Sequence, residues 1–225
     1  MELAIDTSTY FASVALSREG ETIAELTWHA EQNHTVELIP NIEYILNQAK
    51  LNEKSLAAIF VARGPGSFNG LRVGVSTAKG LAFALNIPLV GIGTLEIEAY
   101  PFAPTGLLLC PIHNAGREEI ATALYRQDQG WHCLKEEHIT TVEVLCQYIK
   151  EKTVFCGEIP PTVIEQLRRT LGERAVIPEP AIRLRHACYL AALGWQQLEQ
   201  GHRDDPANLQ PIYLRQPPIT QRKTK

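Results

Sequence analysis

A glycine-rich stretch, ARGPGSFNGLRVGVSTAKG at residues 62–80, is the first place where residue types and spacing could bind a ligand. Gly64 and Gly66 let the backbone approach a phosphate closely, and Ser67 is an acceptable N-cap for a following helix whose amide groups could bind an anion. Neither phosphate-binding template fits. No Gly-Lys-Ser/Thr occurs, and the third glycine slot of G-x-G-x-x-G holds Asn69. The stretch is therefore either a weak anion-binding loop or a tight strand-to-helix turn.

Carboxylates that could support phosphoryl transfer are scarce. That chemistry requires one group that holds a metal and another that orients the nucleophile. Only Asp6 of the four aspartates follows a predicted strand, and the pattern G-x-S-x-G of a nucleophile elbow is absent. We therefore expect no catalytic residue, no metal and no cofactor. Weak candidates for contact with a nucleotide are Asp6, Thr7, Ser8, Gly64, Gly66 and Ser67.

The helix expected over residues 71–85 carries a ridge of very small residues at i, i+4 spacing: Gly70, Gly74, Ala78 and Ala82. Glycine inside a helix costs about 1 kcal/mol relative to alanine, so the close approach of another backbone must offset that cost. That backbone belongs either to a second subunit or to the sheet of the same lobe. For the first alternative the expected interface is His34, Leu38, Ile42, Ile45, Leu71, Gly74, Val75, Ala78 and Ala82.

The elements that must position these residues follow one plan twice. Three apolar strands are expected at residues 2–6, 11–17 and 21–28, followed by helix 34–50, strand 57–63, helix 71–85 and strand 87–93. Strands at 107–113, 119–126 and 131–139 start the second series, followed by helix 141–149, strand 153–157 and helices 161–171 and 186–201.

Two α/β halves of similar plan indicate a duplicated lobe. A Pro/Thr/Gly-rich stretch at residues 99–106 marks the boundary between them. We therefore expect lobes at 1–104 and 105–204, with residues 205–225 as a candidate segment to rejoin the first lobe.

Bulk composition describes an ordinary globular protein. The 225 residues are 45% apolar and 20% charged with a net charge of −4, so the whole surface does not attract polyanions. Two local basic stretches, LRRTLGERA and the tail QRKTK, are either binding patches or solvated surface. No membrane span, basic signal sequence or C-x-x-C pair occurs, and five widely spaced cysteines are typical of a reduced, cytoplasmic protein.

Three segments resemble the TsaB (YeaZ-like) family, bacterial proteins required to form threonylcarbamoyladenosine on tRNA. They are LAIDTST near the start, ARGPGSFNGLRVGVSTAKGLA, and QPIYLR near the end. Two positions depart from the family pattern: Asn69 replaces a threonine, and Asn114 replaces an aspartate. The resemblance implies a two-lobed fold of the actin, Hsp70 and sugar-kinase type, with duplicated lobes like ribonuclease H.

The resemblance also implies a role as a non-catalytic partner. Such proteins activate and scaffold the related catalytic subunit TsaD, with the ATPase TsaE in a larger complex, and form homodimers when alone. They meet tRNA indirectly through the complex. TsaD holds a metal with H-x-x-x-H, whereas His34 is followed here by Leu38, and one imidazole cannot replace two ligands. His34 is therefore expected in a first turn or an interface.

Two enzyme alternatives stay open at this point. One is a small-molecule kinase or phosphatase of the same fold, and the other is a peptidase, which Ser67 alone supports poorly. Both predict turnover by the purified chain, whereas the partner hypothesis predicts none and only weak nucleotide binding.

Overall fold

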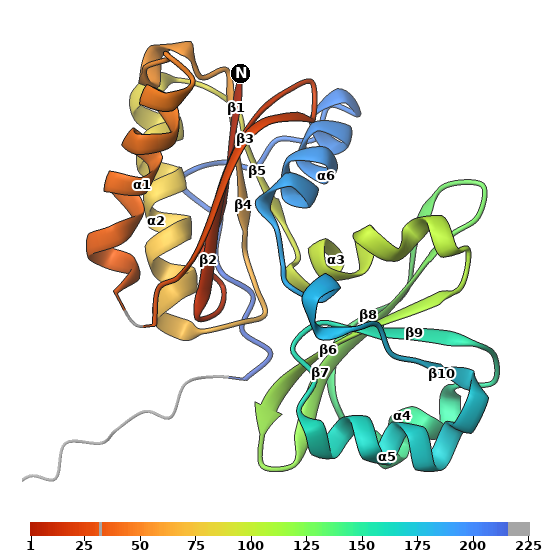
Figure 1. Ribbon diagram of the computed structural model, residues 1–225. Coiled ribbons are helices and arrows are strands. Elements are labelled where there is room, and N and C mark those ends of the chain that lie inside the picture. The colour runs from red at the N-terminus through yellow and green to blue at the C-terminus, as the bar shows by residue number, and fades with distance from the viewer. Residues whose placement is uncertain (32, 216–225) are drawn as a thin grey trace, which may run out of the picture.

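The computed structural model describes residues 1–31 and 33–215 and folds into two α/β lobes, each built on a five-stranded mixed sheet (Figure 1). The first sheet has the order β3-β2-β1-β4-β5 and the second the order β10-β9-β6-β7-β8. In each sheet the central strand, β1 or β6, is antiparallel to the next strand of the chain and parallel to the strand after the helical crossover, β4 or β9. This repeated topology confirms the predicted duplicated fold.

The strands lie close to their expected positions. The first sheet comprises β1 (Glu2–Asp6), β2 (Phe11–Arg18), β3 (Glu21–His29), β4 (Ala58–Ala62) and β5 (Leu89–Ile92). The second comprises β6 (Leu108–Gly116), β7 (Glu119–Gln127), β8 (Trp131–Thr141), β9 (Thr153–Cys156) and the unpredicted β10 (Ala175–Val176). Every residue of β1 and β4 is buried, which agrees with their central place in the sheet.

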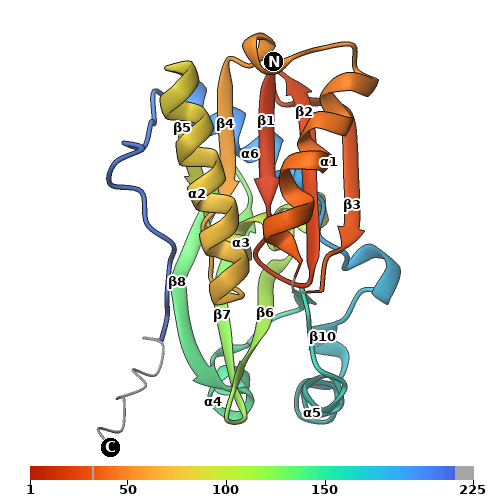
Figure 2. The ribbon, with the colours of Figure 1, turned by 90° about the vertical axis from the view of Figure 1, so that its left-hand side faces the viewer.

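Helices cover both faces of each sheet. On one face of the first sheet lie α1 (His34–Gln48) and α2 (Phe68–Leu85), side by side in Figure 2, and on the other lies α6 (Ala187–Glu199). On the second sheet α4 (Val142–Tyr148) and α5 (Pro161–Leu171) share one face, and α3 (Thr94–Ala99) covers the opposite face. Short 3₁₀ turns lie at Glu53–Ser55, Tyr100–Thr105, Gly172–Arg174 and Pro180–Ile182.

Two helices lie on the sheet of the other lobe, which corrects the expected division at residue 104. The predicted second-lobe helix α6 packs on the first sheet, where Leu190 joins a core cluster with Phe60. The unpredicted α3 lies before the expected boundary, yet Leu95 and Ala99 pack in a cluster of the second sheet. Each lobe is therefore completed by a helix from the other half of the chain.

Pro40 lies inside α1 without ending it. From the sequence, a proline here was expected to break or kink the helix unless it lay in the first turn. The reason is that proline removes the hydrogen bond to the carbonyl four residues earlier. That carbonyl belongs to Val36, whose side chain is 69% exposed on the outer side of the helix. Water can reach it there, while Leu38 and Ile42 keep the inner side of the helix packed in the core.

Residues 202–215 form a strap that runs from the end of α6 along the first lobe and down beside β8 (Figure 2). Asp204 pairs with Leu89 at the edge of the sheet, and Leu209 is buried in the first core cluster. The amide of Ile212 donates to the Arg63 carbonyl at 2.6 Å. At its end Arg215 forms an ion pair with Glu119 of the second lobe. The strap therefore contacts both lobes.

Within the part of the chain that the structure describes, no helix combines the length and the apolar character that a membrane crossing requires. All five cysteines are unpaired, and three of them are buried.

Candidate functional site

The turn after β1 and the glycine-rich loop before α2 close on each other. The Thr7 hydroxyl donates to the Gly70 carbonyl at 2.7 Å, and the Ser67 amide donates to the Ser8 carbonyl at 2.6 Å. A Cβ added at Gly66 would overlap that same Ser8 carbonyl. The glycine is therefore required by the chain's own packing, and the loop does not need a ligand to explain it.

Ser67 caps α2 as predicted. Its hydroxyl accepts a hydrogen bond from the Gly70 amide at 3.4 Å, and the helix begins at the next residue. The loop and the turn after β1 are adjacent. However, the side chains of Asp6, Thr7 and Ser8 are fully buried, and their polar atoms bond within the chain.

Asp6 belongs to a buried chain of charges that joins the two lobes. One carboxylate oxygen of Asp6 accepts hydrogen bonds from the Ser8 amide and hydroxyl at 2.9 and 2.5 Å. The other lies 2.5 Å from Nε of Arg185, whose Nη1 donates to Glu98 at 2.8 Å. The same oxygen of Glu98 lies 2.7 Å from Nε2 of His113. A third Arg185 bond, from Nη2 to the Thr9 hydroxyl at 2.8 Å, satisfies the far end of the guanidinium.

The electrostatics of Arg185 favour a fixed positive charge at this position. Burial by itself lowers the pKa of the guanidinium, but the carboxylates of Asp6 and Glu98 outweigh burial and raise that pKa. The side chains of these three residues are at least 96% buried. Arg185 therefore stays charged and neutralises the buried carboxylate of Asp6.

Sequence reasoning missed Arg185, Glu98 and His113. Arg185 lies in the stretch RLRHA, where nothing in the local pattern separates it from Arg183. Glu98 lies 87 residues earlier in a helix that the sequence did not reveal. A buried pair at that separation leaves no periodic signal, so only the tertiary structure identifies it.

A cavity of about 770 Å³ opens between the lobes above this ion pair. Its walls are largely apolar, with Tyr10, Phe11, Ile159 and Pro160 among the lining residues. In residues 1–31 and 33–215, no three His, Cys, Asp or Glu side chains gather as metal ligands do. The cavity is thus a concave site without a preformed metal cluster in the described chain.

His34 is the first residue of α1, as the sequence predicted, but it faces inward. It is 4% exposed, and its Nε2 lies 2.7 Å from the Thr9 carbonyl, to which it donates. Leu38, one turn later, is packed in the first core cluster. The expected interface position of His34 is therefore corrected to an intramolecular one.

A second cavity, of about 710 Å³, lies where β8, α6 and the strap meet. Two carboxylates, Glu96 and Glu137, line it together with Arg63. Burial raises the pKa of Glu137 to about 7, with Arg63 opposing this shift and Glu96 adding to it. Burial also raises the pKa of Glu96, although the hydrogen bond from Trp131 and the charge of Arg63 lower it in part.

The small-residue ridge of α2 faces the chain's own sheet. A Cβ added at Gly70 or Gly74 would overlap the carbonyl or the hydroxyl of Thr7, and Ala78 and Ala82 belong to the first core cluster. This corrects the expected partner interface, because its whole side-chain set is buried within the lobe. The residues concerned are His34, Leu38, Ile42, Ile45, Leu71, Gly74, Val75, Ala78 and Ala82.

The outward sides of the same two helices carry a different set of residues, here called the outer face. On α1 Val36, Ile39 and Tyr44 are 69%, 43% and 54% exposed, and on α2 Phe83 is 81% exposed. Gly80 lies on this side of α2, and an added Cβ there would have no neighbour within 4 Å. The outer face therefore exposes large apolar side chains beside a shallow, small-residue position.

Comparison with known proteins places these features in a family. The family model of TsaD, described as tRNA N6-adenosine threonylcarbamoyltransferase, matches residues 28–217. The tRNA threonylcarbamoyladenosine biosynthesis protein TsaB of Bacillus subtilis is 33% identical over 218 residues, which cover 95% of this chain and 93% of that protein. The chain belongs to the TsaB (YeaZ-like) family.

Solved structures agree with membership of the TsaB family. YeaZ from Pseudomonas aeruginosa superimposes with a TM-score of 0.81 at 25% identity, covering 95% of this chain and 99% of that one. An activator of the 2-hydroxyisocaproyl-CoA dehydratase from Clostridium difficile, solved with ADPNP, has a TM-score of 0.51 at 9% identity, covering 94% and 99%. The second likeness concerns the fold alone.

The two departures from the TsaB family pattern lie at exposed positions. Asn69 is exposed in the first turn of α2, and the side chain of Asn114 accepts a hydrogen bond from the Gly116 amide at 2.9 Å. This hydrogen bond of Asn114 shapes the turn between β6 and β7. The amide oxygen of asparagine can accept it, so an aspartate carboxylate is not needed at this position.

Proposed function

We propose that this chain is a non-catalytic partner subunit in the formation of N6-threonylcarbamoyladenosine on tRNA, where it activates and scaffolds the catalytic subunit TsaD. TsaE, an ATPase, joins them in a larger complex, and the chain forms a homodimer when TsaD is absent. Membership of the TsaB family supports the pathway, because its curated members are named for this biosynthesis.

The observation that carries the non-catalytic part is the ion pair between Asp6 and Arg185. In an ATP-using protein of this fold, a carboxylate at the end of the first strand helps to hold the metal and phosphates. Here Arg185 and Ser8 occupy both oxygens of that carboxylate. Binding of a magnesium nucleotide would require breaking a buried ion pair, which leaves an uncompensated charge and costs several kcal/mol. This favours a partner over a kinase or phosphatase.

The outer face of α1 and α2 supports the proposed pairing of this chain with TsaD. The match of residues 28–217 to the TsaD family model makes TsaD a protein of related sequence, which offers an equivalent pair of helices. Two such pairs can pack as a four-helix contact, with the apolar side chains of Val36, Tyr44 and Phe83 in its centre. A second copy of the chain offers the same surface, so the homodimer and the TsaD complex exclude each other.

Replacing Gly80 by arginine tests this surface. The position is open on the monomer, and arginine has the higher helix propensity, so the variant should keep its thermal unfolding transition. It should weaken binding to TsaD at least tenfold by isothermal titration calorimetry, since each 1.4 kcal/mol of lost contact is a factor of ten.

The matched control is Thr170→Arg, at an exposed position of α5 on the second lobe, which should bind as the wild type does. Equal binding by both variants, in a protein that still unfolds cooperatively, would remove the outer face from the interface.

A further inference from the structure

Two hollows lie between α6 and the second lobe, and they share two lining residues. The first is the cavity of about 710 Å³ where β8, α6 and the strap meet. The second, of about 560 Å³, lies between α6, the 3₁₀ turn Tyr100–Thr105 and the turn before β8. Trp131 and Gln196 line both hollows. The two hollows are therefore adjacent parts of one concave surface, here called the α6 groove.

One end of the α6 groove is aromatic. Tyr100, Trp131 and Tyr189 come from the 3₁₀ turn, from β8 and from α6, and Pro101 and Pro104 complete this largely apolar wall. Each of the three aromatic side chains is partly exposed. Aromatic side chains provide a large contact area with a fixed shape, so this end of the groove favours a flat, rigid apolar partner group.

Internal contacts fix two of these rings. The Trp131 ring stacks on the buried Tyr125 with ring centroids 5.3 Å apart and 4° between the planes, and Nε1 of Trp131 donates to Glu96 at 2.9 Å. The Tyr100 ring meets Trp131 edge-on at 5.3 Å, and its hydroxyl accepts a hydrogen bond from Gln196 at 2.6 Å. Rings held in this way lose little conformational entropy when a partner packs on them.

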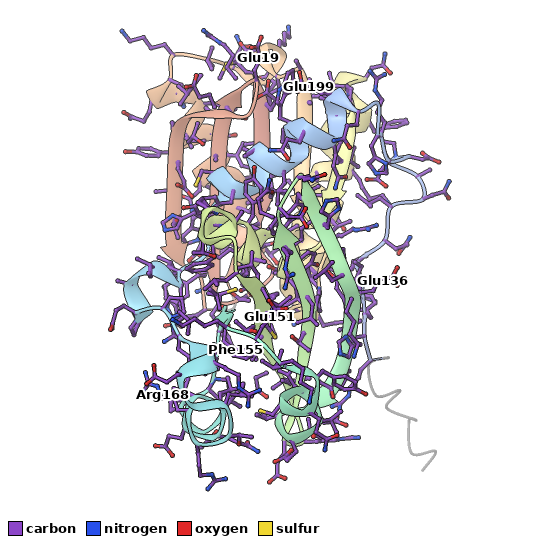
Figure 3. All side chains as sticks on the ribbon, turned by 90° about the vertical axis from the view of Figure 1, so that its right-hand side faces the viewer. Glu19, Glu136, Glu151, Phe155, Arg168 and Glu199 are labelled. Carbon is purple, nitrogen blue, oxygen red and sulfur yellow. The ribbon has the colours of Figure 1, made fainter. Side chains whose placement is uncertain are left out.

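The other end of the α6 groove is acidic. Among its lining residues that the structure describes, three carry carboxylates, namely Glu96, Glu136 and Glu137, and Arg63 is the one cation. Glu136 is exposed on β8 (Figure 3), whereas the other two are half-buried. Burial raises the pKa of both half-buried carboxyls in spite of Arg63, so a further cation beside them would stabilise their charged forms. This end of the groove is therefore complementary to a positive charge.

Aromatic rings beside an acidic hollow match the chemistry of a proline-containing peptide that also carries arginine. A polyproline II segment is extended before it binds and has no internal hydrogen bonds, and its proline rings pack in grooves lined by aromatic side chains. The planar guanidinium of arginine can stack on an aromatic face and can bind a carboxylate through two hydrogen bonds. A small cation would use only the acidic end, and the carboxylates disfavour a polyanion.

We propose that the α6 groove binds a proline-containing extended segment of another protein. Its prolines pack on Tyr100, Trp131 and Tyr189, and an arginine of the same segment lies at Glu96 and Glu137. This goes beyond the proposed function, because α6 lies on the opposite side of the first sheet from the outer face of α1 and α2 (Figure 1).

Fluorescence anisotropy of labelled peptides, titrated with the full chain alone, tests the proposal. Because TsaD is absent, the result does not depend on the proposed function. The probes are two short peptides, P-P-x-P-x-R and R-x-P-P-x-P, which present the arginine after or before the prolines. We expect saturable binding of at least one of them. Replacing its prolines by alanine, or its arginine by glutamine, should weaken binding at least fivefold, which corresponds to about 1 kcal/mol.

Variants of the chain test each end of the groove against a matched control. Glu137→Gln should weaken binding of the peptide at least fivefold, whereas Glu165→Gln, at an exposed position of α5, should stay within twofold of the wild type. Tyr189→Ala should likewise weaken binding at least fivefold, whereas Tyr148→Ala, where the side chain is 59% exposed on α4, should not. Thermal unfolding confirms that each variant is folded.

Three results would overturn the proposal. They are the absence of saturable binding, equal weakening by the groove variants and their controls, and binding that is indifferent to the prolines of the peptide. In the last case spermidine should compete with the peptide, and the groove would be an acidic hollow that accepts any cation. The changes made in the peptide test the proposal without altering the chain, so the result stands even for a groove variant that does not fold.

Discussion

Gly74 and Gly80 lie on the same helix and have opposite surroundings. An added Cβ overlaps the Thr7 hydroxyl at Gly74 and meets nothing within 4 Å at Gly80. The sequence showed that a close backbone approach must offset the cost of Gly74, and the structure identifies that backbone as the turn after β1. Gly80 has no such compensation within the described residues, so nothing in the monomer requires a glycine there.

The two glycines therefore predict opposite changes in stability. Gly80→Ala should raise the free energy of unfolding by about 0.5–1 kcal/mol, the helix-propensity difference. Gly74→Ala should lower it by about 1–3 kcal/mol, because the added methyl group overpacks against Thr7. Urea unfolding followed by circular dichroism measures both. A destabilised Gly80→Ala, or an unaffected Gly74→Ala, would contradict the assigned orientation of α2.

The raised pKa of Glu137 predicts that the stability difference between the wild type and Glu137→Gln depends on pH. Burial raises the pKa of its carboxyl to about 7 in the folded chain, above the value of 4.5 for an unperturbed glutamate. The unfolded state then releases its proton first, so ionisation favours unfolding as pH rises from about 4.5 to 7. Glu137→Gln should therefore be more stable than the wild type at pH 8, with the difference shrinking towards pH 5.

The control for this experiment is Glu136→Gln, at the adjacent exposed residue of β8 (Figure 3). It should unfold at the wild-type urea midpoint at both pH values. A Glu137→Gln variant whose advantage is constant between pH 5 and pH 8 would show that burial of the charge is not the cause.

At the scale of elements, the strap illustrates what sequence patterns miss. Strands such as 2–6 and 11–17 were predictable because their apolar residues form continuous runs bounded by turn residues. The strap has no such periodicity, yet its Leu209 is only 5% exposed among the residues between α2 and the first sheet. Lys79 of α2 fixes it further by donating to the Leu209 carbonyl at 3.0 Å.

Leu209→Ala should accordingly lower the free energy of unfolding by about 2–5 kcal/mol, the cost of a cavity at a buried leucine. The matched control is Leu134→Ala on β8, where the leucine is 53% exposed, and it should change stability by less than about 0.5 kcal/mol. Guanidinium unfolding midpoints compare the two. Similar small effects in both variants would show that the strap does not form part of the core.

The orientation of α2 was likewise beyond prediction. Helical periodicity identified which residues share a side, namely Gly74, Ala78 and Ala82, but not whether that side met the sheet or a partner. The sequence did not reveal helix α3 because its six residues are too few for a periodic signal. The helix also follows a strand directly and leads into a proline-rich turn.

At the scale of the whole molecule, the lobes are joined by exchanged helices and a buried ion network. Helix α6 covers the first sheet and α3 the second, so the chain passes from the first lobe to the second before α3 and returns before α6. Arg185 lies at the last of these crossings and contacts Asp6 of β1 and Glu98 of α3. Sequence patterns predicted the duplication but placed the helix at 186–201 in the second lobe and did not predict α3, because local periodicity does not report which sheet a helix covers.

Removing this arginine should affect the entire fold. Arg185→Met leaves the buried carboxylates of Asp6 and Glu98 without their cation, and should lower the free energy of unfolding by about 3–5 kcal/mol. Adding Asp6→Asn should recover part of this loss, because one unpaired charge is removed. Arg183→Met, in the same segment but half-buried, is the control and should cost much less. An Arg185→Met protein as stable as the wild type would refute the structural role of the pair.

The central claim, that this chain assists catalysis without performing it, is tested most directly by threonylcarbamoyl transfer to tRNA in a purified system. We predict no product, and no ATP turnover, with the chain alone. With TsaD and TsaE from the same organism, product formation should rise with added chain and saturate near one chain per TsaD. Product or ATP hydrolysis by the chain alone, or a TsaD rate that is independent of the chain, would contradict the account.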